Sequence, residues 1–192
     1  KVLNKKQLLA KLHSLPKLKN AIPYVTSYYK KDWGFCIKHS EKLKLKKGNY
    51  KVFIDSKHKK GELNYGEILI KGKSKKEILF STYVCHPEMA NNEVSGISVV
   101  TYLAKWILSK KRNFSYRIIF IPETIGSIAY INKNLKNLKK NLIAGFVVTC
   151  VGDKKKFSYI PSRTGNTLSD FVAKKILKKN KEKYITYSWL DR

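Results

Sequence analysis

The stretch that decides the fold reads STYVCHPEMANNEVSG and covers residues 81–96. An apolar run, Ile78-Leu79-Phe80, precedes it, and a helical pattern from Ile97 to Leu108 follows it. The sequence therefore predicts a buried strand that ends in a polar loop, and the loop leads into the N-terminus of a helix. In an open α/β sheet, ligands bind at the carboxyl ends of the strands. His86 and Asn92, both in this loop, are accordingly the first candidates for chemistry.

Patterns typical of strands and helices alternate from residue 73 onward. Predicted strands cover Glu77–Val84, Tyr116–Ile121 and Leu142–Val151, with a fourth at Phe157–Ile160; predicted helices cover Val94–Leu108 and Thr167–Leu177, and another begins at Thr124–Ile131. The expected apolar faces are Val99, Leu103, Trp106 and Ile107 in the first helix and Leu168, Phe171, Val172, Ile176 and Leu177 in the last. This alternation predicts an α/β fold, a three-layer domain with a mostly parallel or mixed sheet.

The first 72 residues follow different patterns. Leucines at helical spacing predict a helix over Lys5–Leu15, with Asn4 as its N-cap. Over Asn49–Lys71 the apolar period falls to two, which predicts a β-hairpin or small antiparallel sheet with its turn at Lys59-Lys60-Gly61. We therefore expect three parts: residues 1–20 as an N-terminal helix of the α/β domain, residues 21–72 as a small β-rich subdomain, and residues 73–192 as the α/β domain itself.

The chain carries a formal net charge of +28, from 41 Lys and Arg against 13 Asp and Glu. Such a charge can mark binding to nucleic acid or to an anionic surface. However, only four basic residues are Arg, the residue suited to bidentate phosphate and base contacts, and the Lys are spread along the whole chain. We therefore expect a solvated basic surface and no specific nucleic-acid partner, and keep charge-driven binding as a third functional class.

Cysteine usage and hydropathy bear on the compartment. Cys36, Cys85 and Cys150 are odd in number and lack CxxC spacing, which predicts reduced thiols in a cytoplasmic protein; Cys85 and Cys150 are expected to be packing residues. No apolar run approaches the roughly 20 residues that a membrane span needs. Because the chain starts at Lys1 without a Met and stops in sequence of ordered character, we expect a piece of a longer protein.

Polar residues follow three predicted strands, and strand ends of a parallel sheet share one edge. They are His86 with Asn92, then Glu123, then Asp153. A metal or hydrolytic site needs such a convergence of imidazole, amide and carboxylate groups. Other interpretations stay open: a structural His86, and a Glu123 that complements the helix dipole. Asp153 and Arg163 are candidates for substrate contact or for loop salt bridges. Glu88 and Glu93 are expected to be surface and helix-start charges.

At these residues the chain resembles the co-catalytic zinc aminopeptidases. The segment Asn91–Gly96 resembles their Asn-Asp-x-x-Ser-Gly segment, whose Asp bridges two zinc ions downstream of a His ligand. Residues 123–126 resemble their Glu-Glu-x-Gly segment, in which the first Glu is the general base and the second a ligand. Residues 148–152 resemble a strand end with a further Asp ligand. The resemblance implies His86 and the Asn92 position as metal sites and Glu123 as the catalytic base.

A closer resemblance, over nearly the whole chain, is to aminopeptidase-like bacterial proteins associated with polysaccharide biosynthesis. It rests on AIPYVTSYY at 21–29, YVCHP at 83–87, IPETIGS at 121–127 and YIPSR at 159–163. It implies an aminopeptidase-like α/β domain joined to a small β-rich domain.

The chain differs from the zinc enzymes at the positions of their metal ligands. Asn92, Thr124 and Thr149 stand where the zinc enzymes have Asp, Glu and Asp. The resemblance thus implies a zinc-aminopeptidase-like metallohydrolase, incomplete in this piece, that acts on a small peptide or aminoacyl-type substrate. The alternative is a non-catalytic ligand-binding protein of the same fold, linked to polysaccharide biosynthesis.

Overall fold

The computed structural model describes the chain except for residues 28–30, 155, 182 and 191–192. It divides into two compact units, Lys1–Lys60 and Gly61–Arg192. The domain boundaries expected after residues 20 and 72 stay predictions, because compact units need not coincide with the domains of a protein family. In the described part of the chain, no helix has both the length and the apolar character needed to cross a membrane.

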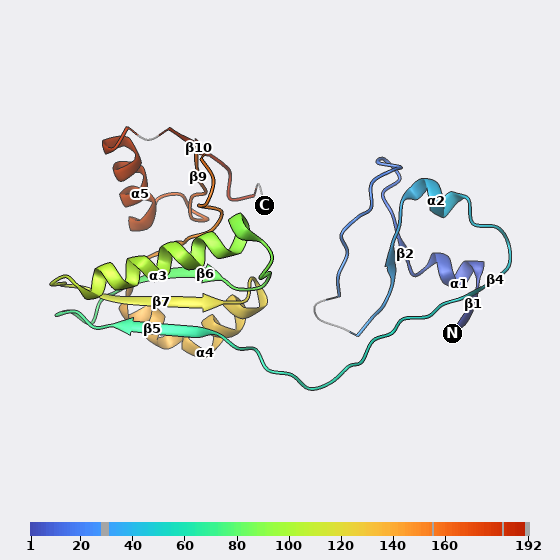
Figure 1. Cartoon of the computed structure of the whole chain (residues 1–192), viewed down its shortest axis with the longest axis horizontal. Helices are drawn as coiled ribbons and strands as arrows, with labels where there is room; N and C mark the ends of the chain where they lie inside the picture. Colours follow the sequence, from blue (N-terminus) through green and yellow to red (C-terminus); the bar gives the residue numbers. More distant parts are fainter. Residues whose placement is uncertain (28–30, 155, 182, 191–192) are drawn as a thin grey trace. The chain divides into compact units, whose positions relative to one another are not determined.

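The first unit consists of short elements, shown in blue to cyan in Figure 1. Its elements are β1 (Val2–Asn4), α1 (Lys5–Leu9), β2 (Leu12–His13), β3 (Phe35–Cys36), α2 (His39–Leu43) and β4 (Asn49–Lys51). Strand β1 pairs with β4 antiparallel, and β2 pairs with β3 parallel. Asn4 caps α1 as expected, through a capping box with Gln7. The helix ends at Leu9, however, so the prediction that it runs to Leu15 is wrong.

The second unit is built on a four-stranded sheet in the order β5-β7-β6-β8. The strands are β5 (Gly66–Ile70), β6 (Glu77–Tyr83), β7 (Ser115–Ile121) and β8 (Leu142–Val147). Strand β6 is parallel to β7 and β8, whereas β5 is antiparallel to β7. The predicted hairpin over Asn49–Lys71 is therefore wrong, because β4 and β5 do not pair: β4 forms a small antiparallel sheet with β1, and β5 joins the main sheet. The predicted mixed α/β class is confirmed.

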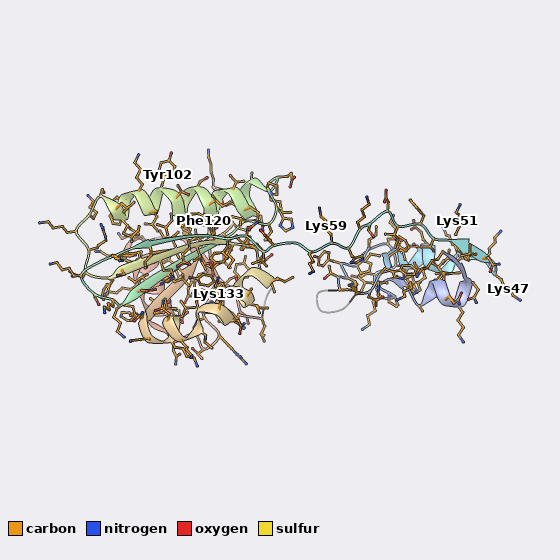
Figure 2. The ribbon with its side chains drawn as sticks, turned by 90° about the horizontal axis from the view of Figure 1, so that it is seen from below. Lys47, Lys51, Lys59, Tyr102, Phe120 and Lys133 are labelled. Atoms are coloured by element: carbon orange, nitrogen blue, oxygen red, sulfur yellow. The ribbon has the colours of Figure 1, made fainter. Side chains whose placement is uncertain are left out.

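Helices connect the parallel strands on opposite faces of the sheet. Helix α3 (Ser95–Leu108) links β6 to β7, and α4 (Ile125–Asn141) links β7 to β8. Figure 2 shows α3, which carries Tyr102, on one side of the sheet and α4, which carries Lys133, on the other. Because neighbouring residues of a strand point to opposite faces, Ile118 packs in the α3 core and Ile119 in the α4 core. The carboxyl ends of β6, β7 and β8 share one edge.

The face that α3 buries differs from the predicted one. Its buried residues are Gly96, Val100, Ala104 and Ile107, whereas Val99 and Trp106 are exposed. Gly96 lets the helix approach the sheet, since a Cβ there would lie 2.5 Å from both Thr82 Oγ1 and the Val148 carbonyl oxygen. The apolar face predicted for the last helix is also wrong, because its apolar side chains are largely exposed and Asp170 is buried.

The remaining elements follow β8. They are β9 (Phe157–Tyr159), α5 (Leu168–Lys179) and β10 (Tyr184–Thr186), with β9 and β10 paired parallel in a sheet of their own. Thr167 caps α5 through a capping box with Asp170. Strand β8 ends at Val147, four residues earlier than predicted, which frees residues 148–153 to form a loop at the edge of the main sheet.

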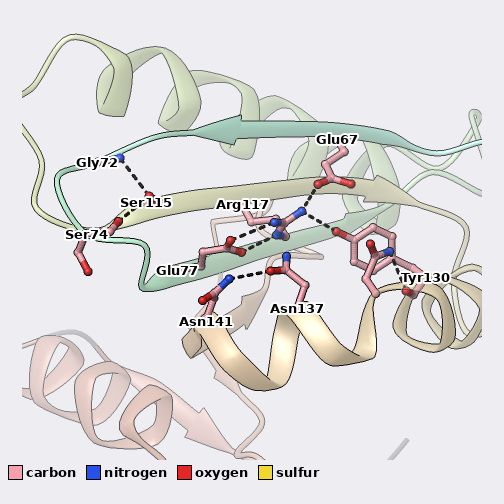
Figure 3. A network of polar contacts seen from close by, with 10 residues as sticks. Glu67, Gly72, Ser74, Glu77, Ser115, Arg117, Tyr130, Asn137 and Asn141 are labelled. Atoms are coloured by element: carbon pink, nitrogen blue, oxygen red, sulfur yellow. Dashed lines mark hydrogen bonds and ion pairs between the residues drawn. The ribbon is translucent and has the colours of Figure 1, made fainter.

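A charged cluster lies on the α4 face of the sheet (Figure 3). Arg117 of β7 is 5% exposed and donates to both carboxylate oxygens of Glu77 on β6, at 2.6 and 3.0 Å. Its guanidinium also contacts Glu67 of β5 and the hydroxyl oxygen of Tyr130 on α4. Hydrogen bonding to Glu77 is the main cause that raises the pKa of Arg117 far above its ordinary value. This cluster ties three strands and a helix together from inside the unit.

Candidate functional site

The loop after β6 folds into a π-helical turn, η1 (Ala90–Val94), before α3 begins. The backbone N–H of Val94 donates to the carbonyl of Met89, five residues back, at 3.2 Å, which is the hydrogen bond that defines a π-helix. Such turns are rare and are frequent at functional sites. Here the turn aims the Glu93 side chain inward, where it is 1% exposed.

Glu93 joins the two ends of this loop. One carboxylate oxygen accepts a hydrogen bond from the backbone N–H of Cys85 at 3.1 Å, and the other lies 3.0 Å from Nδ1 of His86. The His86 side chain is 56% exposed. The carboxylate therefore fixes the imidazole at the surface of the strand edge.

A second contact brings the loop after β7 to the same place. The backbone N–H of Glu123 donates to Cys85 Sγ at 2.7 Å. The neighbouring Thr124 has φ of 54°, a backbone conformation that is costly for a residue with a branched side chain. Such strain is concentrated at functional sites. The backbone of Glu123 therefore lies at the same sheet edge as His86, and the Glu123 side chain is exposed.

The loop after β8 completes the edge from the other side. Thr149 Oγ1 lies 2.8 Å from the Asn92 carbonyl oxygen and 2.5 Å from the Tyr83 hydroxyl oxygen. The Asn92 side chain donates to Cys150 Sγ at 3.6 Å, and Cys150 also has a positive φ, of 53°. The predicted site residue Asn92 is therefore held by the β8 loop, while His86 is held by Glu93.

Tyr83, the last residue of β6, lies between these groups. Burial is the main cause that raises the pKa of its hydroxyl, and the charges of Cys150, Glu123 and Glu93 raise it further, against a hydrogen bond with Thr149 that lowers it. The carboxylates of Glu93 and Glu123 are therefore close enough to act on one hydroxyl group. This places the edge residues of all three strands in one electrostatic environment.

The two predicted substrate residues lie further out. Asp153 is exposed and accepts a hydrogen bond from the Asn91 side chain at 3.2 Å, which ties the β8 loop to η1. Arg163 is exposed in the turn that precedes α5. Among the described residues, no hydrogen bond joins Arg163 to the edge, and its role stays a prediction.

Sequence reasoning missed Glu93 and Cys85. Glu93 was expected to be a helix-start charge, yet it is among the most buried side chains of the chain. A signal was present: Glu93 extends the buried stripe of α3 by one turn, at the spacing 93, 96, 100, 104 and 107. The described residues contain one group of three potential metal ligands, Cys85, His86 and Glu93, whose ligand atoms lie within 4.8 Å of one another.

Fold and site together define a mixed α/β protein with a polar site at the carboxyl edge of its sheet. The chain matches the family described as a domain of unknown function (DUF4910) over residues 12–192, and it belongs to that family. It is similar to a Clostridium acetobutylicum protein named as a candidate polysaccharide biosynthesis protein with an aminopeptidase-like domain. The two are 43% identical over 166 residues, which cover 86% of this chain and 38% of that protein.

A solved structure supports the fold. The crystal structure of a candidate peptidase from Clostridium acetobutylicum matches 98% of this chain with a TM-score of 0.70 and 39% sequence identity. The resemblance to aminopeptidase-like proteins associated with polysaccharide biosynthesis is thereby confirmed. The chain spans less than half of either relative, 44% in the case of the crystal structure.

Proposed function

We propose that this chain forms part of the active site of an aminopeptidase-like metallohydrolase that acts on a peptide or amide bond. The observation that carries the proposal is the meeting of three strand-end loops at one edge. The N–H of Glu123 contacts Cys85, His86 is fixed by Glu93, and Thr149 contacts Asn92. The aminopeptidase-like domain of the curated relative supports the same class.

The chemistry of the donor set argues against a pair of zinc ions. Asn92, Thr124 and Thr149 are neutral where the zinc enzymes carry carboxylates, and Asn92 and Thr149 are engaged with Cys150 and Tyr83. Neutral amide and hydroxyl groups do not balance the charge of two divalent cations. One ion fits better, since the exposed His86 lies beside a single buried carboxylate, that of Glu93.

In the proposed reaction His86 would hold the ion and Glu123 would be the general base. A bound zinc ion would supply Lewis acidity and lower the pKa of a bound water to about 7. The Glu123 carboxylate would take a proton from the attacking water and return it to the leaving amine. Asn92 would be a neutral residue of the metal site. Asp153 and Arg163 would contact the substrate.

The test is hydrolysis of a panel of aminoacyl amides by the zinc-loaded chain and by its Glu123→Gln variant. Loss of a positioned general base costs about 10² to 10⁴ in rate, so kcat should fall by that factor while zinc content stays the same. Glu88→Gln, an exposed acid in the same region, is the matched control and should leave turnover unchanged. Unaltered turnover in Glu123→Gln would remove the proposed base.

A second function follows from the same substitutions. The neutral Asn92, Thr124 and Thr149 suit a non-catalytic protein that binds an aminoacyl or sugar-linked ligand at this edge. It predicts no hydrolysis of any amide in the panel, together with ligand binding that Glu123→Gln does not alter.

A further inference from the structure

We propose that Cys85, His86 and Glu93 form a binding site for a single zinc ion, with a ligand set different from the one that the zinc aminopeptidases use. The proposal deepens the proposed function, because it names the metal ligands at the same edge. It does not depend on hydrolysis, since a non-catalytic protein could hold the same ion.

The three side chains offer one sulfur, one nitrogen and one carboxylate oxygen. Their ligand atoms lie within 4.8 Å of one another, and the His86 nitrogen and a Glu93 oxygen are 3.0 Å apart. Zinc binds sulfur at about 2.3 Å and nitrogen or oxygen at about 2.0–2.2 Å, so ligand atoms of a tetrahedral site lie roughly 3.3–3.7 Å apart. The ligand atoms therefore have to approach one another by no more than about 1 Å to reach this spacing.

The charges of the set match those of zinc. A Cys85 thiolate and the Glu93 carboxylate together balance a divalent cation, and a sulfur ligand favours zinc over magnesium or calcium. The thiolate would also be stabilised by the N–H of Glu123, which already donates to Cys85 Sγ.

Glu93 gives the strongest reason to expect a cation here. It is 1% exposed, and among the described residues its carboxylate has two hydrogen-bonding partners, a backbone N–H and the imidazole of His86. A buried carboxylate is costly unless a cation or several donors compensate it. The exposed His86 provides the route by which an ion could enter.

Three protein ligands leave one tetrahedral position for water or substrate, as in catalytic zinc sites. Asn92, Thr124 and Thr149 need not be ligands in this arrangement. Their neutral side chains are then compatible with a metal site, because the charge is supplied by residues that the zinc enzymes do not use for this purpose.

The experiment is titration of the metal-free chain with Co²⁺ and with Zn²⁺, for the wild type and for Cys85→Ser, His86→Ala and Glu93→Gln. We expect one ion per chain and a thiolate-to-cobalt charge-transfer band in the near ultraviolet. Cys85→Ser should abolish that band. Each variant should weaken zinc at least about 100-fold, the upper end of the loss caused by removing an outer-shell partner.

Two controls are matched to the ligands. Cys150→Ser removes an exposed thiol of the neighbouring loop, and Glu88→Gln removes an exposed carboxylate two residues from His86. Both should bind one ion with unchanged affinity and keep the cobalt band. Circular dichroism checks that each variant folds; if Glu93→Gln does not, the Cys85→Ser spectrum decides alone.

Two outcomes would overturn the proposal: no stoichiometric ion in the wild type, or a loss of binding confined to His86→Ala. The second result would mean that His86 binds through Nε2 with Glu93 as its hydrogen-bond partner. Because the readouts are spectra and stoichiometry, the metal site can be confirmed without any turnover, and its failure is distinguishable from the failure of the proposed hydrolase.

Discussion

Two buried carboxylates of the α/β unit are neutralised in different ways. Glu77 inside the sheet is 5% exposed and accepts two hydrogen bonds from Arg117, whose guanidinium is always charged. Glu93 at the sheet edge is 1% exposed and contacts one backbone N–H and His86, which is cationic only when protonated. The first carboxylate is permanently paired, whereas the pairing of the second depends on what binds beside it. This contrast separates the residues that hold the fold from those available for function.

The largest effect is expected at the permanent pair. Arg117→Met keeps most of the side-chain volume but leaves the Glu77 charge buried without its cation, which costs about 3–5 kcal/mol. Urea unfolding followed by circular dichroism measures the loss. Lys136→Ala, which removes an exposed cation from α4, should change the stability by no more than about 0.5 kcal/mol. A loss below about 1 kcal/mol for Arg117→Met would show that Glu77 does not depend on the guanidinium.

Much of the α/β unit could be predicted from the sequence, because its strands are short apolar runs bounded by polar breaks. Strands β6 and β7 and helix α3 begin and end within a residue of the prediction. The pairing of β5 could not be predicted, since apolar residues at every second position indicate a strand but not the strand with which it pairs. The buried face of α3 was predicted wrongly because the prediction placed large apolar residues such as Trp106 inside. The helix instead packs closely against the sheet through the small residues Gly96 and Ala104.

The conditional pair should respond to zinc. An ion that binds only the folded state stabilises it by about 2.7 kcal/mol when its free concentration is 100 times the dissociation constant. Thermal or urea unfolding with zinc and with a chelator should show this gain in the wild type and in Cys150→Ser. Glu93→Gln should lose most of it at the same zinc concentration. An equal gain in Glu93→Gln would remove Glu93 from the ligand set.

A third buried carboxylate tests whether hydrogen bonds alone suffice. Asp170 is 3% exposed and accepts five hydrogen bonds, from the Tyr159 hydroxyl and from the N–H and hydroxyl groups of Ser162 and Thr167. Burial alone would raise its pKa, but the bonds from Ser162, Thr167 and Tyr159 outweigh burial and hold the pKa below its ordinary value.

The sign of the pH dependence follows from that direction. A carboxyl group whose pKa is depressed on folding stabilises the protein above its unfolded pKa of about 3.9 and loses that contribution as the pH falls. Asp170→Asn should cost about 2 kcal/mol at pH 7, and the difference from wild type should shrink below about pH 5. Urea unfolding at several pH values measures it, with the exposed Glu88→Gln as control. A gap that does not shrink in acid would refute the charged hydrogen-bond network.

The candidate site was predictable in position more than in chemistry. His86, Asn92 and Glu123 follow strands whose carboxyl ends share an edge, and their loops do meet there. Glu93 was expected to be a helix-start charge because a glutamate is rarely fully buried, although it continues the spacing of the buried α3 residues. The contact of Cys85 with Glu123 joins residues 38 positions apart, which local patterns do not report.

The smallest effect is expected for Glu93→Gln in the presence of a chelator. At a pH where His86 is neutral, the carboxylate has little to compensate its burial, and the amide that replaces it keeps an oxygen for the Cys85 N–H. Removing the charge therefore also removes its desolvation cost, and the stability should change by about 1 kcal/mol or less. Glu77→Gln is the matched substitution and should cost about 3 kcal/mol, because it leaves Arg117 short of a buried anion. Equal losses for the two variants would mean that Glu93 is as permanently paired as Glu77, and its availability to a metal would then have no basis.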